Sequence, residues 1–331
     1  MAGRKKKHIV VIGGGTGTSV VLEGLKKYPV NLSAIITTAD DGSSSGKLRD
    51  EFSMIPPGDI RQCLVALAEK DFGYLNERFQ SGSLAGHTLG NLLITLFNEK
   101  HKNFQEAIDD ILRLTGAAGS IIPVTLEPTT LIAKLKSGRT VRGEKNITPS
   151  REISRNLKKL LIVPKNIKAN PRALEAIKSA DVIVVGPGNF YSSIIPNFLV
   201  NEISEHFTKS KAKKIYVVNL FTQPGHTDNF RISDFLSTIA DYVGGDTFTH
   251  IIYNRRAIPE YLLKPYANKI IGAPVSINAD NTQKNGRYIG RALVSASPKK
   301  VSPSDPIANI RNPFLHDSEK LGKTIMEILG K

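Results

Sequence analysis

The sequence predicts an α/β fold of the Rossmann-like, doubly wound type, in which helices cover both faces of a mostly parallel sheet. Three observations point to this class. Short runs of β-branched residues alternate with amphipathic helical stretches along nearly the whole chain. These runs are apolar without alternation, which is typical of strands buried on both faces. The chain has 331 residues, 40% of them hydrophobic, and can therefore bury a large core without disulfides or structural metal.

Each element follows from its local pattern. Residues 8–13 (HIVVIG) are a β-branched run and predict a buried strand. Residues 18–27 predict a helix, because Leu22 and Leu25 recur at helical spacing. The same two patterns predict further strands at 32–38, 181–186, 214–220 and 250–254, and further helices at 58–69, 86–98, 104–114, 169–179, 194–207, 232–243 and 318–329.

The basic segment between residues 124 and 143 departs from this alternation. Two extended runs, 124–136 and 139–143, meet around Ser137 and Gly138, which is a combination typical of a hairpin. We therefore expect a single nucleotide-binding α/β domain over residues 1–331 that carries a small basic hairpin insertion at about 124–143. No linker, repeat or low-complexity tract in the sequence indicates a second domain.

Charge and cysteine content exclude several classes of protein. Lys and Arg number 45 against 30 Asp and Glu, so the net charge is +15, spread along the chain except at residues 4–7 and 209–214. No helix-turn-helix, zinc-finger or RNP-like aromatic pattern accompanies this charge, so we expect no specific nucleic-acid recognition. The single cysteine, Cys63, excludes an internal disulfide.

The sequence also predicts the compartment. The apolar run after residues 4–7 is interrupted by five residues rich in glycine, which is not typical of a secretory signal. No stretch approaches the roughly 20 apolar residues that a membrane-spanning helix needs. We expect a cytoplasmic protein without a membrane span, and a homo-oligomer is one of its possible states.

A glycine-rich turn, GGGTGT, joins the first strand to the first helix. Backbone N–H groups in such a turn can approach a phosphate, and the helix dipole favours an anion there. The spacing is G-x-G-x-G, unlike the G-x-G-x-x-G of dinucleotide-binding enzymes, and no P-loop lysine follows. A tight turn with close helix packing is the alternative interpretation. The candidate phosphate-binding residues are Gly14, Gly15, Thr16, Gly17 and Thr18.

The second strand is followed by DDGSSSGKLR. Nucleotide-binding α/β folds place an acid near this point to bind ribose hydroxyls, and Asp40 is the better candidate. Asp41 can face away, begin a turn or bind a metal, and the two carboxylates together could hold Mg²⁺ with a nucleotide diphosphate. Ser44, Ser45 and Gly46 offer donors to a second anionic group, although the same letters are ordinary turn chemistry. We expect Asp40 at the surface of a loop.

Two further motifs begin predicted helices. In PPGDIR, Asp59 has two interpretations: it could act in the site, or it could have the ordinary role of an acid in the first turn of a helix. In GHTLGN, His87 could contact a phosphate or relay a proton, and Asn91 could bind a sugar, although a lone histidine near a helix start is usually structural.

More polar residues follow the later strands. They lie in the loops GPGNFYSS and NLFTQPGHTDN. Because ligands of open α/β sheets collect at the carboxyl ends of the strands, we expect these loops to form one polar cleft for a phosphorylated ligand with many hydroxyl groups. The candidate binding residues there are Gly186, Pro187, Gly188, Asn219 and Thr222.

Catalytic motifs are scarce. The sequence has no G-x-S-x-G elbow and no H-E-x-x-H, and no histidine lies close to Cys63 in the sequence. Asp41 and His87 are the only catalytic candidates, which leaves transfer of a phosphorylated group open. A nicotinamide-dependent oxidoreductase is disfavoured because no acid/base pair for hydride transfer can be named.

Six motifs in order, GGGTGT, DDGSSSGKLR, PPGDIR, GHTLGN, GPGNFYSSIIPN and NLFTQPGHT, resemble the gluconeogenesis-factor family of YvcK-like proteins, which is related to the CofD-like 2-phospho-L-lactate transferases. The resemblance implies a Rossmann-like fold and a cytoplasmic regulatory protein that binds a nucleotide sugar of the UDP-N-acetylglucosamine type. It also implies roles in carbon metabolism and cell morphogenesis. The related transferases use a nucleotide-linked donor and a divalent metal, so a transferase with Mg²⁺ is the alternative function.

The sequence departs from the family pattern at three positions. Ser43 stands where a second glycine is usual, Lys47 where arginine is usual, and His226 where glutamate is usual. At Ser43, a backbone conformation that favours glycine would be strained. At His226, the resemblance implies no acidic role, because the glutamate is replaced.

Overall fold

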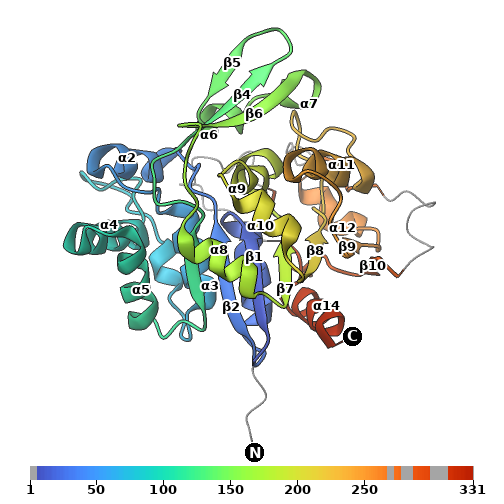
Figure 1. Cartoon of the computed structure of the whole chain (residues 1–331), viewed down its shortest axis with the longest axis horizontal. Coiled ribbons are helices and arrows are strands. Elements are labelled where there is room, and N and C mark those ends of the chain that lie inside the picture. The colour runs from blue at the N-terminus through green and yellow to red at the C-terminus, as the bar shows by residue number, and fades with distance from the viewer. Residues whose placement is uncertain (1–5, 267–271, 277–285, 299–311, 331) are drawn as a thin grey trace, which may run out of the picture.

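The computed structural model describes residues 6–266, 272–276, 286–298 and 312–330. Its body is a seven-stranded sheet with helices on both faces, and a small antiparallel sheet projects from one end of that body (Figure 1). The predicted Rossmann-like α/β class is confirmed.

All paired strands of the main sheet are parallel. Their spatial order is β10-β9-β8-β7-β1-β2-β3, so the chain moves to one side after β1 and returns to the other side at β7. The junction between β1 and β7 is therefore the topological switch point, where open α/β sheets bind ligands. The strands are β1 (His8–Gly13), β2 (Asn31–Ile36), β3 (Ser120–Pro123), β7 (Val182–Val185), β8 (Lys213–Val217), β9 (His250–Asn254) and β10 (Tyr288–Arg291).

Two helical layers bury the sheet because its strands are apolar on both faces. In β1, Val10 and Ile12 face one hydrophobic cluster while Ile9 and Val11 face the other, and all four are fully buried. The first layer holds α8 (Pro171–Ser179), α9 (Ile195–Phe198), α10 (Ile203–Lys209) and α11 (Ile232–Val243). The second holds α1 (Thr16–Leu25), α3 (Gly58–Leu67), α4 (Leu89–His101), α5 (Phe104–Leu114) and α14 (Ser318–Gly330).

The helices differ from the prediction in three places. Residues 43–52, for which the sequence analysis predicted no helix, form helix α2 (Ser43–Phe52). Helix α4 begins at Leu89 instead of residue 86, because the Thr88 side chain caps it by accepting a hydrogen bond from the Asn91 N–H. The helix predicted at 194–207 is broken. A π-helical turn (Phe190–Ile194) precedes α9, and Glu202, with φ of 70°, separates α9 from α10.

Three strands escaped the sequence analysis. They are β3, β10 and β6 (Leu157–Val163). Strands β3 and β10 each have four residues, which is too short for a clear pattern. Strand β6 carries Lys158 and Lys159 in its exposed part, so its apolar run is interrupted.

The projecting sheet has three strands in the order β5-β4-β6. The predicted hairpin corresponds to β4 (Thr130–Leu135) and β5 (Thr140–Arg142), and β6 adds a third antiparallel strand from beyond the predicted insertion. Two short helices, α6 (Glu144–Ile147) and α7 (Ile153–Asn156), connect β5 to β6. We call residues 130–163 the appendage.

The remaining described elements are short helices at the surface. They are the 3₁₀ helices Gly73–Asn76 and Lys264–Tyr266, and α12 (Glu260–Leu263). Among the described residues, no helix combines the length and apolar character that crossing a bilayer requires.

Helices α1 and α14 pack closely through glycine. A Cβ on Gly24 would lie 2.0 Å from the Ser318 carbonyl oxygen, a distance that no side chain tolerates without movement of the backbone. We expect Gly24→Ala to lower the free energy of unfolding by about 1–3 kcal/mol through overpacking. Gly330→Ala, at an open position of α14, is the matched control and should change it by less than about 0.5 kcal/mol. Denaturant titration checks both, and equal effects would contradict the proposed contact.

Candidate functional site

A cavity of about 670 Å³ lies at the carboxyl ends of the central strands. Its wall includes Gly15 after β1, Asp40 after β2, Gly188 after β7 and Asn219 after β8. These four loops therefore meet at the switch point of the sheet. The volume falls within the usual range of small-molecule sites, about 300–1,000 Å³.

Three helices begin at this cavity. The first residues of α1, α2 and α3 line it, and each of the three helices has ten residues. None of the three N-termini is capped by a side-chain hydrogen bond, whereas Thr88, Asn103 and Asn170 cap α4, α5 and α8 in this way. Their backbone N–H groups and dipoles point toward the cavity and favour an anion in it.

The glycine loop contacts the loop after β7 directly. A Cβ on Gly17 would lie 2.0 Å from the Pro187 carbonyl oxygen, so only glycine fits at this point. This contact brings the beginning of α1 against the backbone of Pro187 and Gly188. Thr16, next to it, donates a hydrogen bond to Gln62 Oε1 at 2.5 Å and thereby joins α1 to α3.

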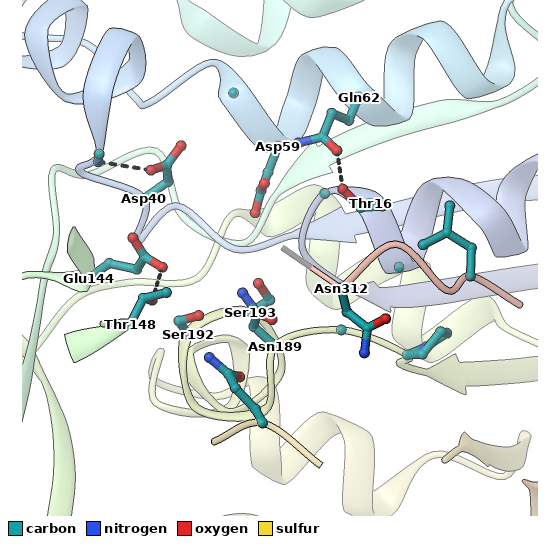
Figure 2. A pocket seen from close by; sticks show the side chains of 18 of the residues that line it. Thr16, Asp40, Asp59, Gln62, Glu144, Thr148, Asn189, Ser192, Ser193 and Asn312 are labelled. Carbon is teal, nitrogen blue, oxygen red and sulfur yellow. Dashed lines mark hydrogen bonds between the residues drawn. The ribbon is translucent and has the colours of Figure 1, made fainter. Parts of the chain in front are cut away.

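Three carboxyl groups lie around one part of the cavity. Figure 2 shows Asp40, Asp59 and Glu144 there, with Ser192 and Ser193 on a neighbouring wall. Burial, and then the charge of Asp40, raise the pKa of Glu144 to about 8, and Thr148 donates a hydrogen bond to its carboxyl. Burial also raises the pKa of Asp40. Each carboxyl group opposes ionisation of the others.

Asp41 does not take part in this group. It is buried and does not line the cavity: its Oδ1 accepts the Lys145 backbone N–H at 2.7 Å, and its Oδ2 lies 4.0 Å from Arg49 Nη1. The structure therefore places Asp41, the candidate metal ligand and catalytic residue, in the contact between α2 and the appendage. Asp40 differs from expectation too, because it is half-buried in the cavity wall and not at the surface of a loop.

His87 and Asn91 belong to one buried network, in which Asn91 lines the cavity and His87 lies behind the wall. The Arg61 guanidinium donates to Asn91 Oδ1 at 2.8 Å and to Thr88 Oγ1 at 2.6 Å. Asn91 Nδ2 donates to Ser44 Oγ at 3.0 Å, so the serine hydroxyl is free to donate to His87 Nδ1, also at 3.0 Å. Burial lowers the pKa of His87, and its ring does not line the cavity. The network fixes this part of the wall and holds the His87 ring outside the cavity lining.

Several polar atoms of the wall have no partner within the described protein. They are Ser192 Oγ, Asn219 Oδ1 and Gln223 Oε1, all shielded from solvent. A buried polar atom without a hydrogen bond is costly, and such atoms in a cavity indicate a place for a ligand. Asn219 is held in position because its Nδ2 donates to the Gly188 carbonyl at 2.8 Å.

The other end of the cavity is apolar. The rings of Phe221 and Phe314 stack there with centroids 5.2 Å apart and an interplanar angle of 25°. Leu220, Leu315 and Pro224 complete this end. The cavity thus combines a polar part beneath three helix N-termini with an aromatic part.

The structure brings together eleven of the sixteen predicted binding residues in the cavity wall. They are Gly15, Thr16, Gly17, Asp40, Ser44, Ser45, Asn91, Pro187, Gly188, Asn219 and Thr222. Five lie outside the wall, namely Gly14, Thr18, Gly46, His87 and Gly186.

Sequence reasoning missed Glu144, Ser192 and Gln223. Glu144 comes from the appendage, and its position follows from tertiary structure alone. Ser192 stands in the quoted GPGNFYSS motif, so that motif was the signal that could have identified it. Asp59 was noted as a capping acid, and the structure places it in the cavity wall.

Comparisons with known proteins agree with this geometry. A family model described as "2-phospho-L-lactate transferase CofD" matches residues 9–294. The gluconeogenesis factor of Listeria innocua is 40% identical over 86% of this chain and 88% of its own length. That of Bacillus subtilis is 33% identical over 98% and 99%. The crystal structure of protein BH3568 from Bacillus halodurans has a TM-score of 0.86 at 35% identity, over 97% of this chain and 100% of that one.

This chain belongs to the gluconeogenesis-factor family, which is related to CofD. The three positions at which this family member departs from the common pattern have distinct settings. Ser43 has a φ of 40°, a conformation that favours glycine, so the serine carries backbone strain. Lys47 is exposed on α2. His226 is fully buried and bonds through Nε2 to the Ile147 carbonyl oxygen at 2.9 Å, which holds the appendage to the body.

The oxygen-rich end of the cavity suits Mg²⁺ in part. Asp40, Asp59 and Glu144 offer the hard oxygen ligands that this ion prefers. Within the described ranges, however, no three His, Cys, Asp or Glu side chains are close enough to hold a metal by themselves. In this protein, a magnesium ion would be coordinated by one or two of these carboxylates and by oxygens of the ligand.

The stability of the protein should depend on pH through Glu144. The native state keeps a proton on this carboxyl up to about pH 8, whereas the unfolded chain releases it near 4.5. Between these values the native state binds more protons, so stability falls as pH rises. In Glu144→Gln this loss should disappear, and the variant should gain stability relative to wild type up to about pH 8. Glu175→Gln, exposed on α8, is the control for denaturant titrations across this range. Parallel curves for wild type and Glu144→Gln would refute the assignment.

Proposed function

We propose that this protein binds a nucleotide sugar of the UDP-N-acetylglucosamine type in the cavity. We further propose that it acts in the cytoplasm as a regulatory protein that links the supply of this ligand to carbon metabolism and cell morphogenesis. The observation that carries the proposal is the convergence of three uncapped helix N-termini on one cavity at the switch point of the sheet. The names of the similar gluconeogenesis factors support the metabolic part of it.

The polar part of the cavity fits a diphosphate and its sugars. Backbone N–H groups at the start of α1 and α2 would bind the phosphates. Asp40 would accept hydrogen bonds from ribose hydroxyls. Ser192 and Asn219, whose unpartnered oxygens lie in the wall, would bind hydroxyl or amide groups of the second sugar. The stacked rings of Phe221 and Phe314 offer an apolar surface to the base.

Binding should stabilise the native state. At a UDP-N-acetylglucosamine concentration of about 100 times the Kd, the linkage contribution is about 2.7 kcal/mol. Thermal-shift and calorimetric titrations with this ligand, GDP and NAD measure it. A shift with the UDP-sugar and none with NAD is the expected result. No response to the UDP-sugar beside a clear response to GDP would contradict the proposal.

Two variants test the site directly. Ser192→Ala removes a buried hydroxyl that has no protein partner, so the free protein should keep its stability while the Kd for UDP-N-acetylglucosamine rises about two- to tenfold. Asp40→Asn should abolish most of the ligand-induced shift. Ser237→Ala and Asp241→Asn, both exposed on α11, are the matched controls and should bind as wild type does. Unchanged affinity in Ser192→Ala and Asp40→Asn would remove this wall from the site.

The carboxyl cluster favours a second candidate function, a CofD-like transfer of a phosphorylated group from a nucleotide-linked donor. Bound Mg²⁺ would supply neutralisation of the diphosphate charge. Asp40 and Asp59 would hold it, and Glu144, with a pKa of about 8, could keep a proton for the leaving group.

Turnover distinguishes the two functions. We expect the protein with Mg²⁺, UDP- or GDP-linked donors and a mixture of acceptors to release no nucleoside mono- or diphosphate above the buffer control. Release that is lost in Asp40→Asn and retained in Asp241→Asn would favour the transferase. Chromatography of the nucleotides gives the measurement.

A further inference from the structure

The sheet of the appendage has one buried face, which packs on α6 and α7, and one face toward solvent. Leu131, Ala133 and Leu135 of β4 point inward and are buried with Leu160 and Ile162 of β6. The alternate residues point outward. We call the set Ile132, Lys134, Thr140, Arg142, Lys159 and Leu161 the outer face. It projects from the end of the body and is part of no cavity wall described above (Figure 1).

The outer face is cationic. The appendage, residues 130–163, contains nine Lys and Arg against two Asp and Glu, a net charge of +7 out of +15 for the chain. Lys134 lies directly opposite Lys159 across the strand pair, and Arg142 lies opposite Ile132. Among the described residues, none of these three cationic side chains makes an ion pair. Like charges directly opposite each other destabilise a sheet, so the Lys134–Lys159 pair is unfavourable for the fold of the appendage.

Apolar side chains lie between the cations. Ile132 and Leu161 pair across β4 and β6 and are half-exposed at the centre of the outer face. The appendage has no aromatic residue: none occurs from 130 to 168. Proteins that bind single-stranded RNA rely on aromatic side chains for base stacking, and binding to a duplex rests mainly on contacts between cations and phosphates, which do not use an apolar pair such as Ile132 and Leu161. The pattern matches an acidic protein surface with apolar residues of its own.

We propose that the outer face is a docking surface for a partner protein that presents an acidic segment with interspersed apolar residues. Carboxylates of the partner would pair with Lys134, Lys159 and Arg142 and would relieve the repulsion between the two lysines. Apolar side chains of the partner would cover Ile132 and Leu161. The surface is separate from the ligand cavity, so the proposal does not depend on the proposed ligand.

Binding of synthetic probes tests the docking surface. The first probe is a fluorescent peptide in which Glu alternates with Val and Leu, because a strand presents alternate residues to one face. The second has Ser in place of Val and Leu. The third is fluorescent oligouridylate. Anisotropy of each with the full-length protein gives the affinities at two salt concentrations. The apolar acidic peptide should bind most tightly, and its affinity should fall with salt.

Two variants and a matched control locate the binding. Lys134→Glu/Lys159→Glu should weaken the apolar acidic peptide by about tenfold or more, equivalent to about 1.4 kcal/mol. Ile132→Thr/Leu161→Thr, which places a β-branched residue suited to a strand at both positions, should remove its advantage over the serine peptide. Lys178→Glu/Lys323→Glu changes the same charge at exposed positions of α8 and α14 and should bind as wild type does.

Circular dichroism and the melting temperature confirm that each variant is folded. The proposal fails if neither peptide binds at low salt, or if the control variant loses as much affinity as the outer-face variant. It also fails if oligouridylate binds more tightly than both peptides and does not respond to Ile132→Thr/Leu161→Thr, because the face would then be a nucleic-acid surface.

Discussion

The contact between Gly17 and the Pro187 carbonyl oxygen is the constraint on which the site depends. Pro187 follows β7 and Gly17 follows β1, the two strands between which the sheet changes direction. With no side chain between them, the two loops approach to van der Waals distance. The beginning of α1 then lies against the segment that leads from β7 to the π-helical turn with Ser192, and both line the cavity. A larger residue at position 17 would separate the walls that a ligand must touch together.

The appendage completes the cavity and is held from two sides. Asp41, after β2, accepts the Lys145 N–H, and His226, after β8, bonds to the Ile147 carbonyl oxygen. Both contacts fix α6, whose Glu144 stands in the cavity wall. The buried Asp41 therefore has a structural role, because it binds α6. The buried His226 has the same role from the other side. Strand β5 ends one residue before α6, so the outer face and the cavity share one short, rigid connection.

The sequence was sufficient for features that depend on local patterns. Strands such as β1, and helix α11 with its regular apolar spacing, could be placed because periodicity alone defines them. The strand-end loops could be assigned to one edge because parallel strands share their direction. Glu144 could not be found, since its place in the wall arises from a segment more than 100 residues beyond Asp40. Asp41 was ambiguous for the same reason: its partner, Lys145, comes from that segment.

Helix α6 lies between the carboxyl groups of the cavity and the cationic side chains of the outer face. In the cavity, burial and then the charge of Asp40 raise the pKa of Glu144. The three helix N-termini there favour an anion. The outer face concentrates unpaired lysines. Gly143, with φ of 88°, turns the chain between them, and a Cβ at this position would lie 2.4 Å from Asp41 Oδ2, so a side chain there would clash. Glu144 and Lys145 line the cavity and follow β5 after one residue, so α6 is the shortest covalent connection between the cavity and the outer face.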